Sequence, residues 1–148
     1  MRKSSADSQL LEPIRQRIRA AGLRSTAARL AVMQELLGAN SPLTHAQVAV
    51  RLDRRGFDRA TIYRNLIELA ESGLLSRIEL GDHVWRFEAR HDEADGPAEH
   101  PHFVCVDCGE VACLPSVNVR ITPAPGGIGS VIGQVTEVLL KGRCGHCA

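Results

Sequence analysis

Residues 44–66 read THAQVAVRLDRRGFDRATIYRNL, and this stretch decides the fold of the first half of the chain. Thr44 and Gln47 form a capping-box pattern, in which each side chain satisfies a backbone N–H group at the start of a helix. Gly56 is suited to end that helix, and Asp58 is suited to cap the next one. Two helices joined by a short turn predict a helix-turn-helix, whose second helix enters the major groove of DNA.

The sequence on either side of this stretch extends the pattern. Apolar residues recur at three- and four-residue steps over residues 10–21 and 26–37, which predicts two further helices. After Gly73 the apolar residues alternate, so residues 74–80 and 83–88 are predicted to form a hairpin. Helices followed by a hairpin indicate a winged helix-turn-helix. A helical bundle with an incidental hairpin is the alternative.

Charge divides the chain of 148 residues into a basic and an acidic part. Residues 1–80 carry 13 Lys and Arg and 8 Asp and Glu, whereas residues 81–148 carry 5 and 9, which gives balances of +5 and −4. All five cysteines and five of the six histidines lie in the acidic part. The pattern favours two domains, one that binds a polyanion and one that binds metal, although chance also varies the charge of small domains.

The second helix of the helix-turn-helix carries four candidate DNA contacts in its first two turns: Arg59, Thr61, Tyr63 and Arg64. The guanidinium fork of arginine fits guanine edges and phosphates, and hydroxyl groups bind phosphates. Arginines elsewhere in the basic part, Arg17, Arg24 and Arg29 among them, either add phosphate contacts or solvate helix faces. Aromatic residues make up 3% of the chain, which disfavours a single-strand binder that stacks bases.

The composition, with 44% hydrophobic and 24% charged residues, is typical of an ordinary globular protein. No apolar run is long enough to span a bilayer, and the N-terminal residues lack the apolar segment of a secretory signal. We therefore expect a cytoplasmic location. Disulfides are rare there, so cysteine pairs indicate metal or redox groups first.

Four of the five cysteines form two CxxC pairs: Cys105 with Cys108, and Cys144 with Cys147. Each pair supplies two thiolates along one edge of a tetrahedron, so two pairs complete a closed Zn²⁺ site. Such a site has no open position for a substrate, which predicts a structural rather than a catalytic ion. Two independent redox pairs are the alternative.

A second set of candidate ligands surrounds the predicted junction of the two domains: Glu88, His100, His102 and Cys113. His100 and His102 share one face of an extended segment, because alternate residues point the same way. A mixed set of nitrogen, sulfur and oxygen donors at a junction predicts an exchangeable, regulatory metal site. Surface histidines and a small buried cysteine are the alternative.

Four stretches together resemble the ferric uptake regulator (Fur) family of metal-sensing bacterial repressors: residues 21–29, 60–66, 100–109 and 142–147. The resemblance implies a winged-helix DNA-binding domain and a β-rich dimerisation domain. It also implies a homodimer that binds a palindromic operator and represses transcription when the regulatory metal is bound.

The resemblance also implies roles for individual residues. Tyr63 and Arg64 match the family's recognition-helix contacts, and Arg24 matches its basic residue for the minor groove. The two CxxC pairs match the structural zinc. Three residues match ligands of the sensing site at the hinge: Glu88, His100 and His102.

The chain departs from the family pattern in three places. Pro42 stands where the family often has a sensing histidine; His45, three residues later, is either a substitute ligand or an exposed residue at a helix start. Cys113 stands where the family usually has an acidic ligand. Residues 121–130 are rich in Pro and Gly and are not expected to form the family's helix, so the dimer interface is expected to be altered.

Cys113 bears on the identity of the regulatory metal. A thiolate beside two imidazoles and a carboxylate favours Zn²⁺ and disfavours manganese, so we expect a zinc-responsive repressor, with Fe²⁺ as the second choice. An oxidisable thiolate also allows a peroxide- or redox-responsive regulator. A further alternative is a zinc-ribbon interaction module that binds its partner regardless of the regulatory metal.

Together these predictions describe an α+β protein that is not an enzyme. Residues 1–88 are expected to form the winged-helix domain, 89–100 a hinge, and 101–148 the dimerisation and metal-binding domain. A thiol enzyme that uses Cys113 is disfavoured, because no oxyanion-hole motif is visible. The expected partners are double-stranded operator DNA and a second copy of the chain, with no membrane.

Overall fold

The computed structural model describes residues 4–90, 100–126 and 131–148, and for residues 4–8 only the backbone. The chain divides into two compact units, Met1–Arg90 and His91–Ala148. The division falls within residues 89–100, the predicted hinge, most of which lies outside the described residues. No described helix has the length and apolarity that a membrane span requires.

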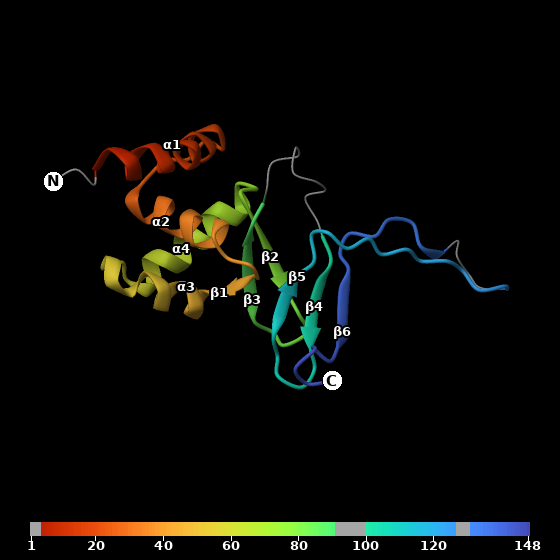
Figure 1. Ribbon diagram of the computed structural model, residues 1–148. Coiled ribbons are helices and arrows are strands. Elements are labelled where there is room, and N and C mark those ends of the chain that lie inside the picture. Colours follow the sequence, from red (N-terminus) through yellow and green to blue (C-terminus); the bar gives the residue numbers. More distant parts are fainter. Residues whose placement is uncertain (1–3, 91–99, 127–130) are drawn as a thin grey trace. The chain divides into compact units, whose positions relative to one another are not determined.

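The first unit contains four α-helices, a short 3₁₀ helix and a small antiparallel sheet (Figure 1). The helical elements are α1 (Ser4–Ala20), α2 (Ala27–Leu37), α3 (His45–Leu52), η1 (Asp53–Arg55) and α4 (Arg59–Glu71). The strands are β1 (Leu43–Thr44), β2 (Leu75–Glu79) and β3 (Trp85–Ala89), in the order β1-β3-β2. This mixture of helices and strands confirms the predicted α+β class.

The caps predicted around the helix-turn-helix are present. The Thr44 hydroxyl accepts a hydrogen bond from the Gln47 backbone N–H at 3.1 Å, and the Gln47 side chain accepts one from the Thr44 N–H at 2.9 Å. The Asp58 carboxylate accepts from the Thr61 N–H at 2.6 Å. Gly56 adopts φ 75°, the left-handed conformation that suits glycine, and turns the chain from η1 toward α4.

An apolar core joins these elements. Each of α1, α2, α3, α4 and β3 contributes at least one fully buried side chain, for example Ile18, Met33, Leu52, Leu66 and Phe87. Helix α1 begins at Ser4, six residues before the predicted start, and Leu10 is 73% exposed although it was predicted to lie on the inner face. The core reaches only the later turns of α1, where Ile14 and Ile18 pack against it.

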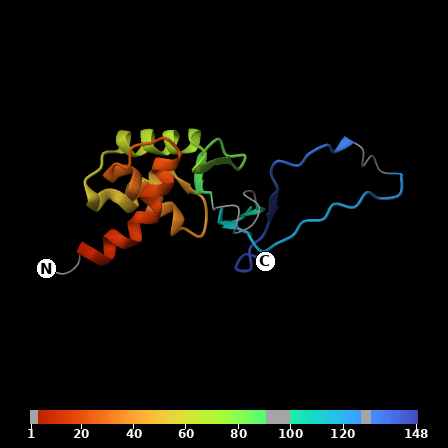
Figure 2. The ribbon, with the colours of Figure 1, turned by 90° about the horizontal axis from the view of Figure 1, so that it is seen from above.

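The second unit contains a three-stranded sheet with the order β5-β4-β6. Strand β5 (Val111–Cys113) is antiparallel to β4 (His102–Cys105), whereas β6 (Leu139–Gly142) is parallel to it. The final strand therefore begins four residues later than the predicted 135–140. The described residues of the connection between β5 and β6, 114–126 and 131–138, contain no α-helix (Figure 2). The predicted absence of a helix over 121–130 agrees with residues 121–126, and residues 127–130 lie outside the described part of the chain.

Candidate metal centres and nucleic-acid interface

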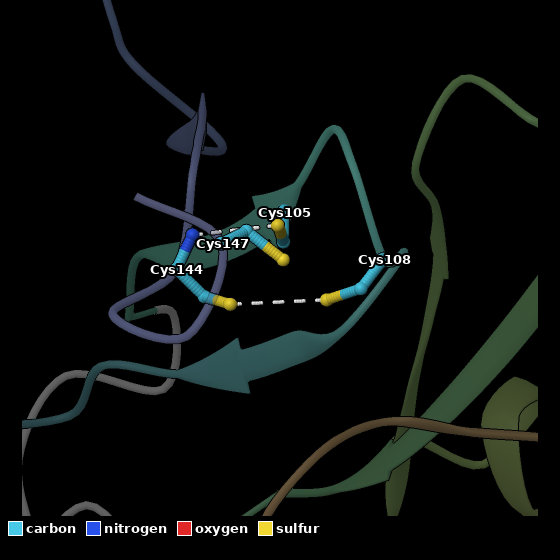
Figure 3. A group of neighbouring side chains, drawn as sticks. All are labelled: Cys105, Cys108, Cys144 and Cys147. Carbon is cyan, nitrogen blue, oxygen red and sulfur yellow. Dashed lines mark hydrogen bonds between the residues drawn. The ribbon is translucent and has the colours of Figure 1, made fainter.

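The strand pairing of the second unit brings the two CxxC pairs together. Cys105 ends β4, and its partner across the parallel ladder is Gly142, the last residue of β6. Cys108 follows in the turn after β4, and Cys144 and Cys147 follow β6. The four sulfur atoms consequently face a common centre from the two turns (Figure 3).

The distances among the four sulfurs fit one tetrahedral ion. All four lie within 4.8 Å of one another, and the Sγ atoms of Cys108 and Cys144 are 3.8 Å apart. A Zn–S bond of about 2.3 Å places the sulfurs of a tetrahedral site about 3.8 Å apart, far beyond the roughly 2.05 Å of a disulfide. The cysteines are thiols. The donor set and its spacing therefore fit Zn²⁺.

Hydrogen bonds and neighbouring thiols shift the pKa values of Cys105 and Cys147 in opposite directions. Backbone N–H groups of Cys108 and Cys144 donate to the sulfur of Cys105 and lower the pKa of that thiol to about 6. The side chains of Cys144, Cys108 and Cys105 raise the pKa of the Cys147 thiol to about 12. Four thiolates thus do not coexist without a cation. Binding of a divalent ion would remove this repulsion and release protons.

A polar contact links the two metal-binding turns on the surface. The Arg143 guanidinium lies 3.0 Å from the Asp107 carboxylate, which is inside the first CxxC pair. Both side chains are largely exposed, so this ion pair contributes little stability by itself. Backbone hydrogen bonds also join the two turns: the Val106 N–H donates to the Gly142 carbonyl at 2.8 Å, and the Cys144 N–H donates to the Cys105 sulfur at 3.3 Å.

Three of the predicted regulatory ligands converge within the second unit. His102 on β4 pairs with Cys113 on β5 across the antiparallel ladder, and the ring centroids of His100 and His102 are 5.0 Å apart. Ligand atoms of these three residues lie within 4.8 Å of one another. His102 is buried, whereas His100 and Cys113 are half-buried. Two imidazoles and a thiol form a set that suits a borderline-soft divalent ion.

The fourth predicted regulatory ligand, Glu88, lies in the first unit. It occupies β3, where its partner on β2 is Ser76, and its side chain is half-buried. Glu88 comes one residue before the end of that strand.

Sequence analysis missed two further potential ligands near Cys144. Glu110 and His146 offer ligand atoms within 4.8 Å of one another and of the Cys144 sulfur. The signal was present, because His146 stands between the two cysteines of the second CxxC pair. Cys144 also belongs to the four-sulfur set. A metal bound by Glu110, Cys144 and His146 would therefore take one ligand away from that set.

The start of α4 presents the predicted DNA contacts to solvent. Arg59, Tyr63 and Arg64 are exposed, whereas Thr61 is half-buried. Arg24, in the connection between α1 and α2, is exposed as well. A cationic and hydroxyl-bearing surface on one helix end is the arrangement that a helix-turn-helix uses in the major groove.

Other arginines of the basic unit have structural partners instead. The Arg29 guanidinium pairs with the Glu68 carboxylate and donates to the Arg24 carbonyl, so it links α2 to α4. Arg17 donates to the carbonyl of Arg90. Fewer arginines are therefore free to contact DNA than the number in the basic part of the sequence suggests.

Comparison with known proteins identifies relatives of most of the chain. Residues 20–120 match the profile described as the Ferric uptake regulator family. "Ferric uptake regulation protein 1" of Mycolicibacterium fortuitum is 34% identical over 109 residues, which cover 73% of this chain and 63% of that protein. "Peroxide-responsive repressor PerR" of Staphylococcus epidermidis is 30% identical over 72% of this chain and 68% of the relative.

A solved structure shows the same fold. The ferric uptake regulator of Pseudomonas aeruginosa, determined with manganese, is 26% identical, with a TM-score of 0.59 over 88% of this chain and 96% of that one. Against the Mycolicibacterium fortuitum relative, the match spans slightly less than two thirds of the relative's length.

Proposed function

Because this chain belongs to the ferric uptake regulator family, we propose that it is a metal-responsive repressor of transcription that binds duplex DNA. One observation carries the proposal: the small second unit gathers two separate sets of sulfur and nitrogen donors, and the first unit is a basic helix-turn-helix. A protein that only bound DNA would not need a second, mixed set of ligands.

The first part of the proposal is a structural Zn²⁺ held by Cys105, Cys108, Cys144 and Cys147. Among residues 100–126 and 131–148, only His102 and Cys105 are buried, so the unit has almost no apolar core. Small units of this kind require metals or other cross-links to fold. The four thiolates would supply that cross-link.

The second part is a regulatory metal held by His100, His102 and Cys113, joined by Glu88. Two imidazoles, a thiolate and a carboxylate favour zinc, with iron as the second choice. Glu88 belongs to the other unit, so a metal that takes this carboxylate as a ligand would restrict how the two units move. Restricting that motion would change how the helix-turn-helix meets its target.

The third part is the DNA interface, with Arg59, Thr61, Tyr63 and Arg64 in the major groove. Arg24 would contact the adjacent minor groove. Arginine in a narrow minor groove gains from the strong negative potential there. Thr61 is half-buried, which suits an apolar contact of its methyl group with a thymine methyl better than a hydrogen bond.

The last part is a homodimer on a palindromic operator. The loop between β5 and β6 exposes six apolar side chains: Val117, Val119, Ile121, Val131, Ile132 and Val135. Several exposed apolar side chains in one loop favour an interaction surface there. A second copy of the chain would cover them. The cytoplasm, whose reducing conditions preserve the thiols, is the location that suits this protein.

Binding to duplex DNA with and without the exchangeable metal tests the proposal. The duplex is first selected from a random-sequence pool with the fully zinc-loaded protein. We expect affinity for it to fall at least tenfold when mild chelation empties the regulatory site. The His102→Ala variant should bind as weakly as the chelated protein. Equal affinity in all three states would overturn metal-responsive repression.

Peroxide sensing is a second candidate, favoured by the position of Cys113 beside two histidines. Its thiolate, held near a metal, is open to oxidation to a sulfenic acid by hydrogen peroxide. Mass analysis after peroxide treatment distinguishes the two candidates. Oxidation at Cys113 that coincides with loss of DNA binding supports sensing of peroxide, whereas unmodified Cys113 supports sensing of metal alone.

A further inference from the structure

We propose that His45 is a positioning residue for DNA recognition, which links the first helix of the helix-turn-helix to the second and holds the ring of Tyr63 in place. This inference rests on the proposed DNA-binding function. The sequence leaves two interpretations of His45: a substitute metal ligand, or an exposed residue at a helix start. His45 does begin α3, but its side chain is half-buried and makes two contacts.

His45 connects the first residues of the two helices. It is the first residue of α3, and its Nε2 atom lies 2.9 Å from the carbonyl oxygen of Arg59, the first residue of α4. A carbonyl oxygen only accepts, so Nε2 carries the hydrogen and donates it. This bond spans 14 residues of sequence and fixes the start of α4 against the start of α3.

The same imidazole contacts the aromatic ring of Tyr63. The two ring centroids are 5.3 Å apart and the ring planes meet at 63°, an edge-to-face arrangement. Such pairs are favourable because the positive edge of one ring meets the negative face of the other. Tyr63 is 49% exposed, so about half of its surface is not held by packing against the protein. The imidazole therefore limits the orientations that Tyr63 samples before DNA arrives.

This restriction has a consequence for binding. Ordering a mobile side chain at an interface opposes association, and a side chain that is already ordered avoids that cost. Tyr63 lies between Arg59 and Arg64 in sequence, on the helix end that presents the candidate contacts. His45 itself needs no contact with DNA to raise affinity, since it acts through Tyr63 and through the position of Arg59.

A metal-ligand role for His45 receives no support from its surroundings. Within the part of the chain that the structure describes, three groups of side chains place metal-binding atoms close together, and His45 belongs to none of them. Pro42, at the position where a sensing histidine was considered, is buried. The histidine at the start of α3 therefore serves the helix-turn-helix.

A double-mutant cycle on the full-length, zinc-loaded protein tests the inference. Affinity for the selected duplex is measured for the parent, His45→Ala, Tyr63→Ala and the double variant. Ordering a side chain at an interface costs about 0.5–1.5 kcal/mol, so we expect His45→Ala to weaken binding by about 2- to 13-fold. In the Tyr63→Ala background the same change should weaken binding by a clearly smaller factor, because the ring contact is gone and only the hydrogen bond to the Arg59 carbonyl remains to be lost.

Two further variants separate the contacts of His45. His45→Gln keeps a hydrogen-bond donor without the ring, and His45→Phe keeps a ring without the donor. Each should restore part of the lost affinity. Val50→Ala, at an exposed residue of the same helix, is the matched control and should bind as the parent does. The salt dependence of binding should stay unchanged in His45→Ala, because no phosphate contact is removed.

Three outcomes would overturn the inference while leaving DNA binding intact. One is unchanged affinity in both His45→Ala and His45→Gln. Another is an equal loss from His45→Ala with and without Tyr63, which would mean that His45 acts independently of the tyrosine. The third is a parallel fall in the melting temperature of the first unit, which would make the role merely structural. A parent protein that selects no duplex from the pool instead refutes the proposed function, and this inference with it.

Discussion

The two units of this protein differ in what stabilises them. The first has a continuous apolar core that joins four helices to a sheet, including fully buried Ile18, Leu66 and Phe87. The second buries only His102 and Cys105 among its described residues and has a long exposed loop. The first unit can therefore fold by burial of apolar surface, whereas we propose that the second needs sulfur ligands around an ion.

The largest expected effect is the loss of the second unit when its zinc ligands are removed. Structural zinc contributes about 10–16 kcal/mol in comparable small sites, which exceeds the stability of most domains. In the double variant Cys144→Ser, Cys147→Ser we expect fast hydrogen exchange throughout residues 100–148. Residues 10–90 should exchange as slowly as in the parent. Slow exchange in both units would contradict the comparison.

A core substitution should show the opposite pattern. Leu66→Ala removes a fully buried side chain from α4 and should lower the free energy of unfolding of the first unit by about 2–5 kcal/mol. Denaturant unfolding followed by far-UV circular dichroism measures this, because the helices belong to that unit. The zinc content should remain that of the parent. A loss of zinc in Leu66→Ala would mean that the two units do not fold separately.

Cys113→Ser should distinguish the two ligand sets within the second unit. Loss of an outer hydrogen-bond partner of a metal ligand weakens binding about 10- to 100-fold, and loss of a ligand should cost at least as much. We expect weaker binding of the exchangeable metal, measured by competition with a chelating dye. The tightly held zinc should be unaffected. If the tight zinc also becomes labile, the two sets are not independent.

The smallest expected effect concerns the basic unit alone. Arg64→Ala removes one exposed cation from α4 and should lower the slope of log affinity against log salt by about one. Fluorescence anisotropy at several salt concentrations measures this slope. Arg29→Ala, whose side chain pairs with Glu68, should lower stability and leave the slope unchanged. If both variants lowered the salt slope equally, Arg29 would contact DNA phosphates despite its pairing with Glu68.

Much of the local structure was predictable because it depends on residues close in sequence. The capping box at Thr44, the N-cap at Asp58 and the pairing of His100 with His102 each involve neighbours two to four positions apart. The CxxC pairs are similar, because two-residue spacing brings both sulfurs to one edge of a tetrahedron. A four-coordinate zinc site requires both pairs, so the sequence also predicts that the two distant pairs lie together. The pairing of β4 with β6 brings them together.

The remaining features depend on contacts between distant parts of the chain. Strand β1 has only two residues and exists because Leu43 pairs with Phe87, which no local pattern indicates. The exposure of Leu10 depends on where the core ends. The link between Arg29 and Glu68 spans 39 residues, and it removes a cation that the sequence appeared to offer to DNA. The roles of His45 arise in the same way.

X-ray absorption at the zinc edge is the most direct measurement of the central claim. The sample is freshly prepared, reduced, full-length protein from which mild chelation has removed any loosely held metal. The account predicts one zinc per chain with four sulfur ligands at about 2.3 Å. A second unit that remains folded with no zinc, or zinc bound mainly through nitrogen and oxygen, would contradict it.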